Sequence, residues 1–256
     1  MGPRSPRNTA DRIGATLEQR GGVMRWLAVL LVACAAGCGV NPIPEPPFER
    51  PPALAGDVVG AVCDVCDGAP LELTGAPGSV TDADVVWAMN LDGTAPPVVA
   101  PVAGDGSFAL DIDGLRGNEL RLQARRGALR SEPVDLIAAS GALEPSPRPL
   151  AGCFEVEREL ALPEAAAGAA SSSAVALAHF CGAPLAIDRI ALRAPAPEYS
   201  LEGTAAPVVL EAGSAGELRV VYRPTGAAAR EEVALIEVSS PEVFRRAVTL
   251  FVPGAP

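Results

Sequence analysis

The chain has 256 residues and a formal net charge of −11, with no lysine and a single histidine, His179. An acidic chain is repelled by phosphate backbones, which argues against nucleic acid as a partner. The absence of lysine excludes a Walker-type phosphate loop and a Schiff-base lysine. Any histidine-dependent triad or multi-histidine metal site would rest on His179 alone.

An apolar run from Trp26 to Val40 lies near the amino terminus. Its 15 residues fall short of the about 20 that a transmembrane helix needs. The letters "MR", "WLAVLLV" and "AAG" supply, in order, the basic start, apolar core and small residues of a secretory signal. This arrangement resembles the lipobox of bacterial lipoproteins. The resemblance implies that the next residue, Cys38, is acylated and becomes the new amino terminus.

Cys34 is the alternative lipidation site, because "LVAC" also fits the lipobox. Cys38 is favoured for two reasons. A signal starting at Met24 would have only ten residues before Cys34. Lipid on Cys38 with loss of Cys34 would also leave four of the six cysteines, an even number suited to disulfides. An uncleaved anchor is a further alternative. A lipidated protein and an uncleaved anchor would both place the rest of the chain outside the cytoplasm.

Two proline-rich segments divide the rest of the chain. We expect a leader and signal peptide over 1–37 and a lipidated, Pro-rich linker over 38–53, which would act as a polyproline stalk. A second Pro-rich linker over 143–149 separates residues 54–142 from 150–256. It has little apolar content, so we expect the two halves to fold independently.

The half from 54 to 142 is predicted to form a β-sandwich. "GSFALDI" alternates apolar and polar residues, as half-buried strands do, and the Asp-Gly pairs at 92–93 and 105–106 indicate tight hairpins. Strand spacing of about 8–12 residues without a helical period favours a sandwich. The candidate strands are 57–62, 83–91, 96–102, 106–112, 118–126 and 131–138.

This half resembles the carboxypeptidase regulatory-like, transthyretin-like sandwich. The resemblance covers most of 57–138 and depends on an opening strand with a glycine, "DVVGAV", a strand "VVWA" and a strand that begins "DGSF". It implies a non-catalytic accessory module with an immunoglobulin-like fold.

The half from 150 to 256 is also predicted to be strand-rich, and the segment 163–174 is expected to be a loop. "VALAHFCG", "EYSL", "VVLEAGSAGELRVVYRPTGAA", "ALIEVSS" and "AVTLFVPG" resemble the Hydin-like, choice-of-anchor D-type and major-sperm-protein-like immunoglobulin domains. That resemblance implies binding or scaffolding without a reaction. The candidate strands are 153–163, 174–182, 185–193, 207–224, 230–240 and 244–253.

Four cysteines are disulfide candidates in an exported protein. Cys63 and Cys66 form a C-x-x-C motif, but a glycine and a proline follow it where redox motifs usually open a helix, and two aspartates disfavour the thiolate. A structural disulfide is the favoured interpretation, with zinc binding, redox work and free thiols as alternatives. Cys153 and Cys181 are expected to join the first strand of the second half to a neighbour.

The remaining candidate chemistry is weak. His179 and Cys181 could share a strand face, but no third ligand is evident, so a polar or sheet-edge histidine is favoured. "DIDGLRGNE" at 111–119 lacks the spacing of a calcium loop. The adjacent Glu231 and Glu232 should point to opposite faces of a strand, which makes a poor carboxylate dyad. We expect no cofactor, no metal and no catalytic residue.

The sequence therefore predicts an all-β protein with two immunoglobulin-like sandwiches in tandem behind a signal peptide and a Pro-rich stalk. Its expected place is the bacterial cell envelope, as an outer-membrane lipoprotein facing the periplasm or the cell surface. It would be a non-catalytic binding or structural module that is held to the membrane by lipid, with envelope proteins or polysaccharide as partners. The alternatives are a thiol-redox or metal-dependent protein centred on Cys63 and Cys66, and an assembly subunit that adds a strand to a partner's sheet edge.

Overall fold

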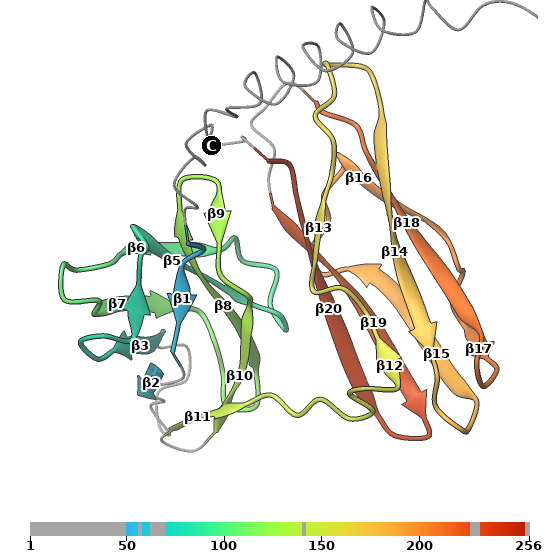
Figure 1. Cartoon of the computed structure of the whole chain (residues 1–256), viewed down its shortest axis with the longest axis horizontal. Helices are drawn as coiled ribbons and strands as arrows, with labels where there is room; N and C mark the ends of the chain where they lie inside the picture. Colours follow the sequence, from blue (N-terminus) through green and yellow to red (C-terminus); the bar gives the residue numbers. More distant parts are fainter. Residues whose placement is uncertain (1–49, 56–57, 62–69, 140–141, 226–230, 254–256) are drawn as a thin grey trace, which may run out of the picture. The chain divides into compact units, whose positions relative to one another are not determined.

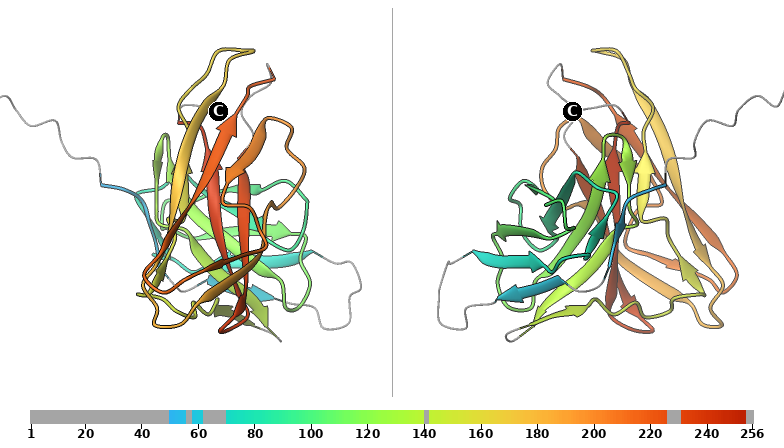
Figure 2. Two further views of the ribbon diagram at one scale, coloured as in Figure 1. Left: turned by 90° about the vertical axis from the view of Figure 1, so that its right-hand side faces the viewer. Right: turned by 60° about the vertical axis from the view of Figure 1, so that its left-hand side comes forward.

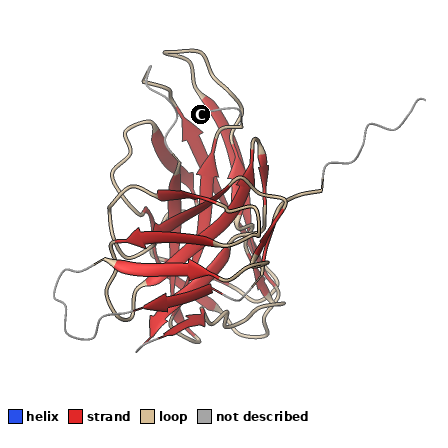
Figure 3. Cartoon of the chain, turned by 90° about the vertical axis from the view of Figure 1, so that its left-hand side faces the viewer, coloured by secondary structure: helices blue, strands red, loops and turns tan. Residues whose placement is uncertain are grey.

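The computed structural model describes residues 50–55, 58–61, 70–139, 142–225 and 231–253. The predicted leader, most of the stalk and four of the cysteines (Cys34, Cys38, Cys63 and Cys66) lie outside these ranges. All the regular structure in the described ranges consists of strands, as Figure 3 shows. None of the described residues belongs to a helix that could cross a membrane.

The first sandwich pairs a six-stranded sheet with a three-stranded one, and neighbouring strands in both are antiparallel. The six-stranded sheet has the order β11 (Ala142–Pro145), β10 (Val134–Ala139), β8 (Glu119–Arg126), β5 (Val85–Asn90) and β6 (Val98–Pro101), with β9 (Leu129–Arg130) beside β8. The three-stranded sheet has the order β2 (Val58–Ala61), β3 (Leu71–Gly75) and β7 (Phe108–Ile112), and the short β1 (Ala53–Leu54) pairs with β4 (Val80–Thr81).

The second sandwich pairs a four-stranded sheet with a five-stranded one. The four-stranded sheet has the order β12 (Phe154–Glu155), β14 (Ser171–His179), β18 (Ala215–Tyr222) and β16 (Tyr199–Gly203). The five-stranded sheet has the order β13 (Glu159–Ala161), β20 (Phe244–Phe251), β19 (Glu232–Ser240), β15 (Leu185–Leu192) and β17 (Val208–Leu210). In both sandwiches the first, second and fifth main strands share one sheet and the third, sixth and seventh share the other, which is the immunoglobulin order.

Two segments of the second sandwich leave one sheet and join the other. The first begins as β12, antiparallel to β14, and continues as β13, parallel to β20. The second begins as β16 beside β18 and continues as β17 beside β15. At each crossing the segment becomes an edge strand of the second sheet and stops pairing with its former partner strand in the first sheet. The first crossing matters for the site described below.

The six-stranded sheet of the first sandwich packs against the five-stranded sheet of the second. Residues 50–256 accordingly form one compact unit. Figures 1 and 2 show the four sheets as successive layers, with β5 and β8 facing β19 and β20. β5 and β8 are therefore covered on both faces, one by their own core and one by the second sandwich.

The structure confirms the all-β, two-sandwich prediction, and each predicted strand region contains at least one strand. "GSFALDI" buries Phe108, Leu110 and Ile112 as its alternation indicates. The unpredicted β3 lies between β2 and β7, and its Leu71 and Leu73 are buried in the same core. Residues 163–170 form the expected loop, while 171–173 already belong to β14.

Three expectations need correction. Residues 143–145 of the predicted 143–149 linker form part of β11, which pairs with β10. Pro145 is tolerated there because β11 is an edge strand and an edge residue can lack a ladder donor. Ala53, the last residue of the predicted 38–53 linker, begins β1. Asp105-Gly106 turns the chain from one sheet to the other, between β6 and β7, and so does not make a hairpin.

Candidate functional site at the junction of the two sandwiches

The two sandwiches share an apolar cluster. Trp87 and Met89 on β5, with Leu91 just after it, pack with Val233, Leu235 and Ala247 of β19 and β20. These side chains belong to neither sandwich core, since Val86 and Ala88 of β5 point into the first core instead. The expectation that the halves fold independently considered only the linker, whereas the contact between them uses strand faces.

A second set of contacts is polar and starts from β8. Arg121 is 1% exposed and holds Asp135 of β10 with two hydrogen bonds, at 2.7 and 2.9 Å. Its Nη1 also donates across the junction to Thr249 Oγ1 and to the carbonyl oxygen of Arg158, both at 3.1 Å. Arg158 donates to Asp135 as well, at 2.8 Å. The Asp135 carboxylate thus binds one arginine from each sandwich.

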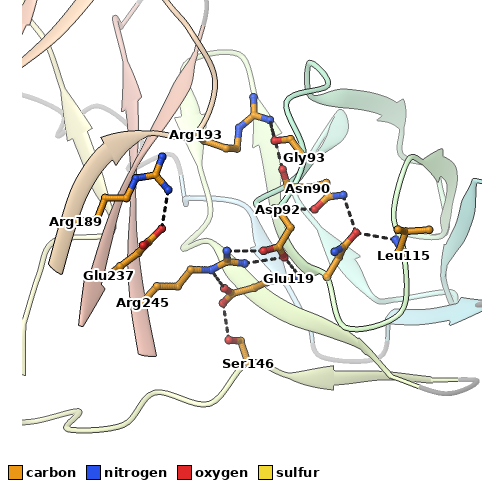
Figure 4. Close-up of polar contacts among 11 residues, drawn as sticks. Asn90, Asp92, Gly93, Leu115, Glu119, Ser146, Arg189, Arg193, Glu237 and Arg245 are labelled. Atoms are coloured by element: carbon orange, nitrogen blue, oxygen red, sulfur yellow. Dashed lines mark hydrogen bonds and ion pairs between the residues drawn. The ribbon is translucent and has the colours of Figure 1, made fainter. Parts of the chain in front are cut away.

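Arg193 crosses the junction from the other side. It pairs with Glu232 at 3.0 Å within the second sandwich, and its Nη1 donates to the carbonyl oxygens of Gly93 and Ala95 in the first, at 2.6 and 3.0 Å. Figure 4 shows this contact beside Arg245, which binds Asp92 at 2.6 and 2.9 Å and also Glu119. Arginines of the second sandwich therefore hold both carboxylates and backbone of the first.

The adjacent acids Glu231 and Glu232 have separate structural roles. Glu231 accepts hydrogen bonds from Arg125 and Arg130 of the first sandwich, and Arg125 also stacks on Trp87 at 4.4 Å. Glu232 is fully buried against Arg193. The two carboxylates are thus each paired with arginine.

The charges at the junction shift their own pKa values. Burial raises the pKa of Asp135, but the charges and hydrogen bonds of Arg121 and then Arg158 lower it by more, so the net pKa lies below its usual value. The pKa of Asp92 is likewise lowered, because the hydrogen bonds from Arg245 and the backbone of Glu119 outweigh the effect of burial. Both carboxylates are therefore ionised at neutral pH and serve as fixed negative partners.

Beside this contact lies an open groove with a volume of about 660 Å³. Its walls are the crossing segment 154–159, the outer face of β14 at Ala176 and Ala178, and Glu132-Pro133 from the first sandwich. The exposed Glu132, Glu155 and Glu157 lie along it. No ion pair in the described part of the chain engages these three carboxylates, and they outnumber the one unpaired cation of the lining, Arg148, so the rim of the groove is negatively charged overall.

The floor of the groove contains an open sheet edge. β14 pairs with β18 along Ser171 to Ala178, but β12 covers its other side only at Ala178 and His179. Phe180 N–H donates to the Cys153 carbonyl on that side, so the even-numbered residues of β14 direct their backbone groups there. Ala174 and Ala176, both exposed, thus have no strand hydrogen-bonded to that side among the described residues, although β13 lies close by and its Ala161 carbonyl accepts the Ser173 hydroxyl at 3.1 Å. We call this stretch the open edge.

The predicted Cys153–Cys181 disulfide is present and closes one end of the open edge. The two Cα atoms are 4.8 Å apart, and the bond joins the residue before β12 to the loop after β14, as expected. His179 is fully buried beside it and lies opposite Phe154, so it is not at an exposed sheet edge. Its Nε2 is 2.9 Å from the Ala183 carbonyl oxygen.

The other predicted site residues (Cys34, Cys38, Cys63 and Cys66) lie outside the described ranges, so their expected roles stay predictions. No group of three or more His, Cys, Asp or Glu side chains within those ranges is arranged to hold a metal ion. In the "DIDGLRGNE" segment, Asn118 accepts the Leu115 N–H at 2.7 Å and binds Asn90, which is turn chemistry. No pattern in the sequence predicts the open edge, because this edge depends on where the chain crosses between sheets.

No protein-family model matches the sequence, and no curated protein matches it either. Among solved structures, similarity is found to the seventh PapD-like domain of human CEP192 (14% identity, TM-score 0.33), which aligns over 44% of this chain and 94% of that domain. A Porphyromonas gingivalis W83 protein of unknown function (11%, 0.32) aligns over 78% and 99%, and the Vibrio cholerae VesB protease (8%, 0.33) over 80% and 100%. Likenesses this distant carry over neither an activity nor a partner.

Proposed function

We propose that this protein is an exported, lipid-anchored module of the bacterial envelope that binds an extended, positively charged segment of another envelope protein and catalyses no reaction. The observation that carries the proposal is the open edge of β14 in an acid-rimmed groove. A strand added to this edge would satisfy the free N–H and C=O groups of Ala174 and Ala176. The unpaired carboxylates of Glu132, Glu155 and Glu157 would attract basic side chains on such a strand.

The rigidity of the junction supports this proposal. One wall of the groove comes from the first sandwich and the floor from the second, so the groove keeps its width only while the two stay together. The Arg121–Asp135–Arg158 contact lies directly behind it. Edge strands exposed in this way are usually blocked in natural proteins, which makes an unblocked one a candidate for binding.

Site-specific photocrosslinking in the native envelope tests the binding site. A photoreactive amino acid at position 176 of the full chain should give a discrete protein adduct that mass spectrometry can identify. The matched control is position 202, which is exposed on β16 at the opposite margin of the same sheet. Adducts from position 202 and none from position 176 would refute binding in the groove. A polysaccharide adduct at position 176 would refute a protein partner.

Two further variants test how the segment is held. With the photoreactive residue kept at 176, Ala174→Pro removes an N–H that faces the groove and none that bonds β18, so it should abolish the adduct while the sheet remains. The double variant Glu155→Gln, Glu157→Gln should weaken capture and make it less sensitive to salt, because two of the three exposed carboxylates on the rim are removed and exposed charges act over about 10 Å at 0.1 M salt. Glu202→Gln serves as the control for the loss of a charge elsewhere on the sheet.

The anchor and the absence of catalysis need separate experiments. Labelling with a palmitate analogue should tag the wild type and fail with Cys38→Ser, whereas failure with Cys34→Ser would move the anchor to Cys34. Two or more acyl chains would hold the protein firmly on the membrane. If the protein reduces a test disulfide and Cys63→Ser abolishes this activity, the redox alternative is correct and the binding-module proposal is wrong.

A further inference from the structure

A small, partly enclosed pocket lies behind the groove, between the two sandwiches. Its volume is about 20 Å³, slightly more than the roughly 10–15 Å³ that one buried water needs. It lies where β8 and β10 of the first sandwich meet β20 and the connecting segment 146–148. We call it the arginine pocket, because five arginines line it: Arg121, Arg148, Arg158, Arg245 and Arg246.

The charges in the arginine pocket do not balance. Only two carboxylates line it, Glu119 and Asp135, so the lining has an excess of three positive charges in a protein whose net charge is −11. Arg245 finds a further carboxylate in Asp92, outside the lining. Two arginines, Arg148 and Arg246, have no carboxylate partner among the described residues.

Arg246 is the residue that most needs a partner. It is 6% exposed, and its Nε is buried without a hydrogen-bond acceptor among the described residues. Its other nitrogens bond only carbonyl oxygens, those of Arg245 at 3.4 Å and of Pro149, and its guanidinium lies over the ring of Phe244 at 4.4 Å. Burial, and then the charge of Arg148, lower the pKa of Arg246 to about 10 although the charge of Glu119 acts in the opposite direction without forming an ion pair with it. It stays charged at neutral pH.

A buried cation of this kind is unfavourable unless an anion compensates for it. Elsewhere at the junction each buried arginine has a carboxylate, as Arg193 has Glu232 and Arg121 has Asp135. Among the described residues, Arg246 is the one buried arginine of the junction without a carboxylate in an ion pair, and it lines a pocket with room for one atom-sized ligand. A water could accept the Nε–H bond, but only an anion would also offset the excess charge.

We propose that the arginine pocket binds one small anion, of the size of chloride, between Arg246 and Arg148, and that this anion strengthens the contact between the two sandwiches. The site is distinct from the open edge of β14 and does not depend on the groove's binding a partner. The expected ligand class is a small inorganic anion, because the pocket cannot enclose a larger organic one.

Thermal unfolding of the purified full-length protein tests this proposal. Sodium gluconate is replaced stepwise by sodium chloride at constant ionic strength, since gluconate is too bulky for the pocket. The Tm of the wild type should rise saturably, by about 3–6 °C when chloride reaches ten times its dissociation constant. Chlorine-35 NMR should show an excess line width from bound chloride that bromide can reduce by competition.

Variants distinguish a bound anion from a general salt effect. Arg246→Met keeps much of the aliphatic bulk and should lose both the Tm rise and the excess line width. Arg148→Met removes an exposed charge, leaves the buried contact in place, and should raise the chloride concentration needed; it carries the test if Arg246→Met does not fold. Arg219→Met, at an exposed position on β18, should behave as the wild type. Equal chloride responses in all four proteins, or none in the wild type, would mean that the pocket holds water only.

Discussion

Arg193 and Glu232 form an ion pair in which both side chains are almost completely removed from solvent, with exposed fractions of 1% and 0%. Glu232 also accepts the backbone N–H of Val233 at 2.9 Å, and the Nη1 of Arg193 donates to carbonyl oxygens of the other sandwich. A pair so enclosed stabilises only while both members are present, because either one alone is a buried charge without a counterion.

Removal of one member should therefore lower the free energy of unfolding strongly, and removal of the second should add less than its own single loss. Glu232→Ala should lower the free energy of unfolding by about 3–5 kcal/mol, and the double variant Arg193→Met, Glu232→Leu by clearly less than the two single losses added together. Urea unfolding measures both. Arg189→Ala, which breaks the exposed pair with Glu237, should cost at most about 1 kcal/mol. Additive losses in the double variant would contradict the coupling.

The shared apolar cluster predicts that the two sandwiches unfold together. Differential scanning calorimetry of the full chain should show a single transition for residues 50–256, with calorimetric and van't Hoff enthalpies that agree. Ala247→Glu places a charge in the cluster and should lower the Tm and separate the transition into two. Ala174→Glu, at an exposed position on β14, is the control. Two transitions in the wild type would restore independent folding of the halves.

The Cys153–Cys181 bond should stabilise the second sandwich through the loop that it closes. The sequence separation of 28 corresponds to roughly 3–4 kcal/mol in the chain-entropy model. The double variant Cys153→Ala, Cys181→Ala should lose about this amount in urea unfolding, and a reductant should then have no further effect on this sandwich. Peptide mapping that finds Cys153 alkylated in the native protein would contradict the pairing.

Acid should weaken the junction through Asp135. Its pKa is lower in the folded protein than in the unfolded chain, so its stabilisation is complete above the unfolded pKa and is lost as the pH falls through the folded value. The free energy of unfolding should thus decrease below about pH 4. In urea titrations, Asp135→Asn should start from a lower stability but decrease less steeply with acid. The exposed Asp111→Asn should keep the wild-type slope.

Much of the fold can be predicted from the local alternation of apolar and polar residues, but the burial of a polar strand face cannot. Phe108, Leu110 and Ile112 identify β7 and its buried face from spacing alone. On β8, Leu120 and Leu122 alternate with Arg121 and Gln123 in the same way, which is the pattern of a strand with one solvated face. Yet Arg121 and Gln123 are each 1% exposed. The second sandwich covers them, and a strand carries no local sign of what covers its polar face.

The candidate site was harder to foresee than the fold. The disulfide could be predicted because an even number of cysteines in a chain that is expected to be exported suggests pairing. The open edge of β14 could not, because Ala174 and Ala176 are ordinary strand residues and their lack of a neighbour arises from the crossing of the chain after Glu155. A buried arginine without a carboxylate, Arg246, likewise becomes visible only when its surroundings are known.

Two of the arginines that join the sandwiches bind main-chain carbonyls of the other sandwich, and Arg121 also binds the Thr249 side chain there. Arg193 binds Gly93 and Ala95 in this way, and Arg121 binds Arg158. A carbonyl oxygen is present whatever the residue, so positions 93 and 95 are free to drift among descendants without loosening the contact. Paired substitutions across the junction should consequently be rare at these positions. The mutual placement of the two sandwiches can thus be inherited while leaving little trace in the covariation of their sequences.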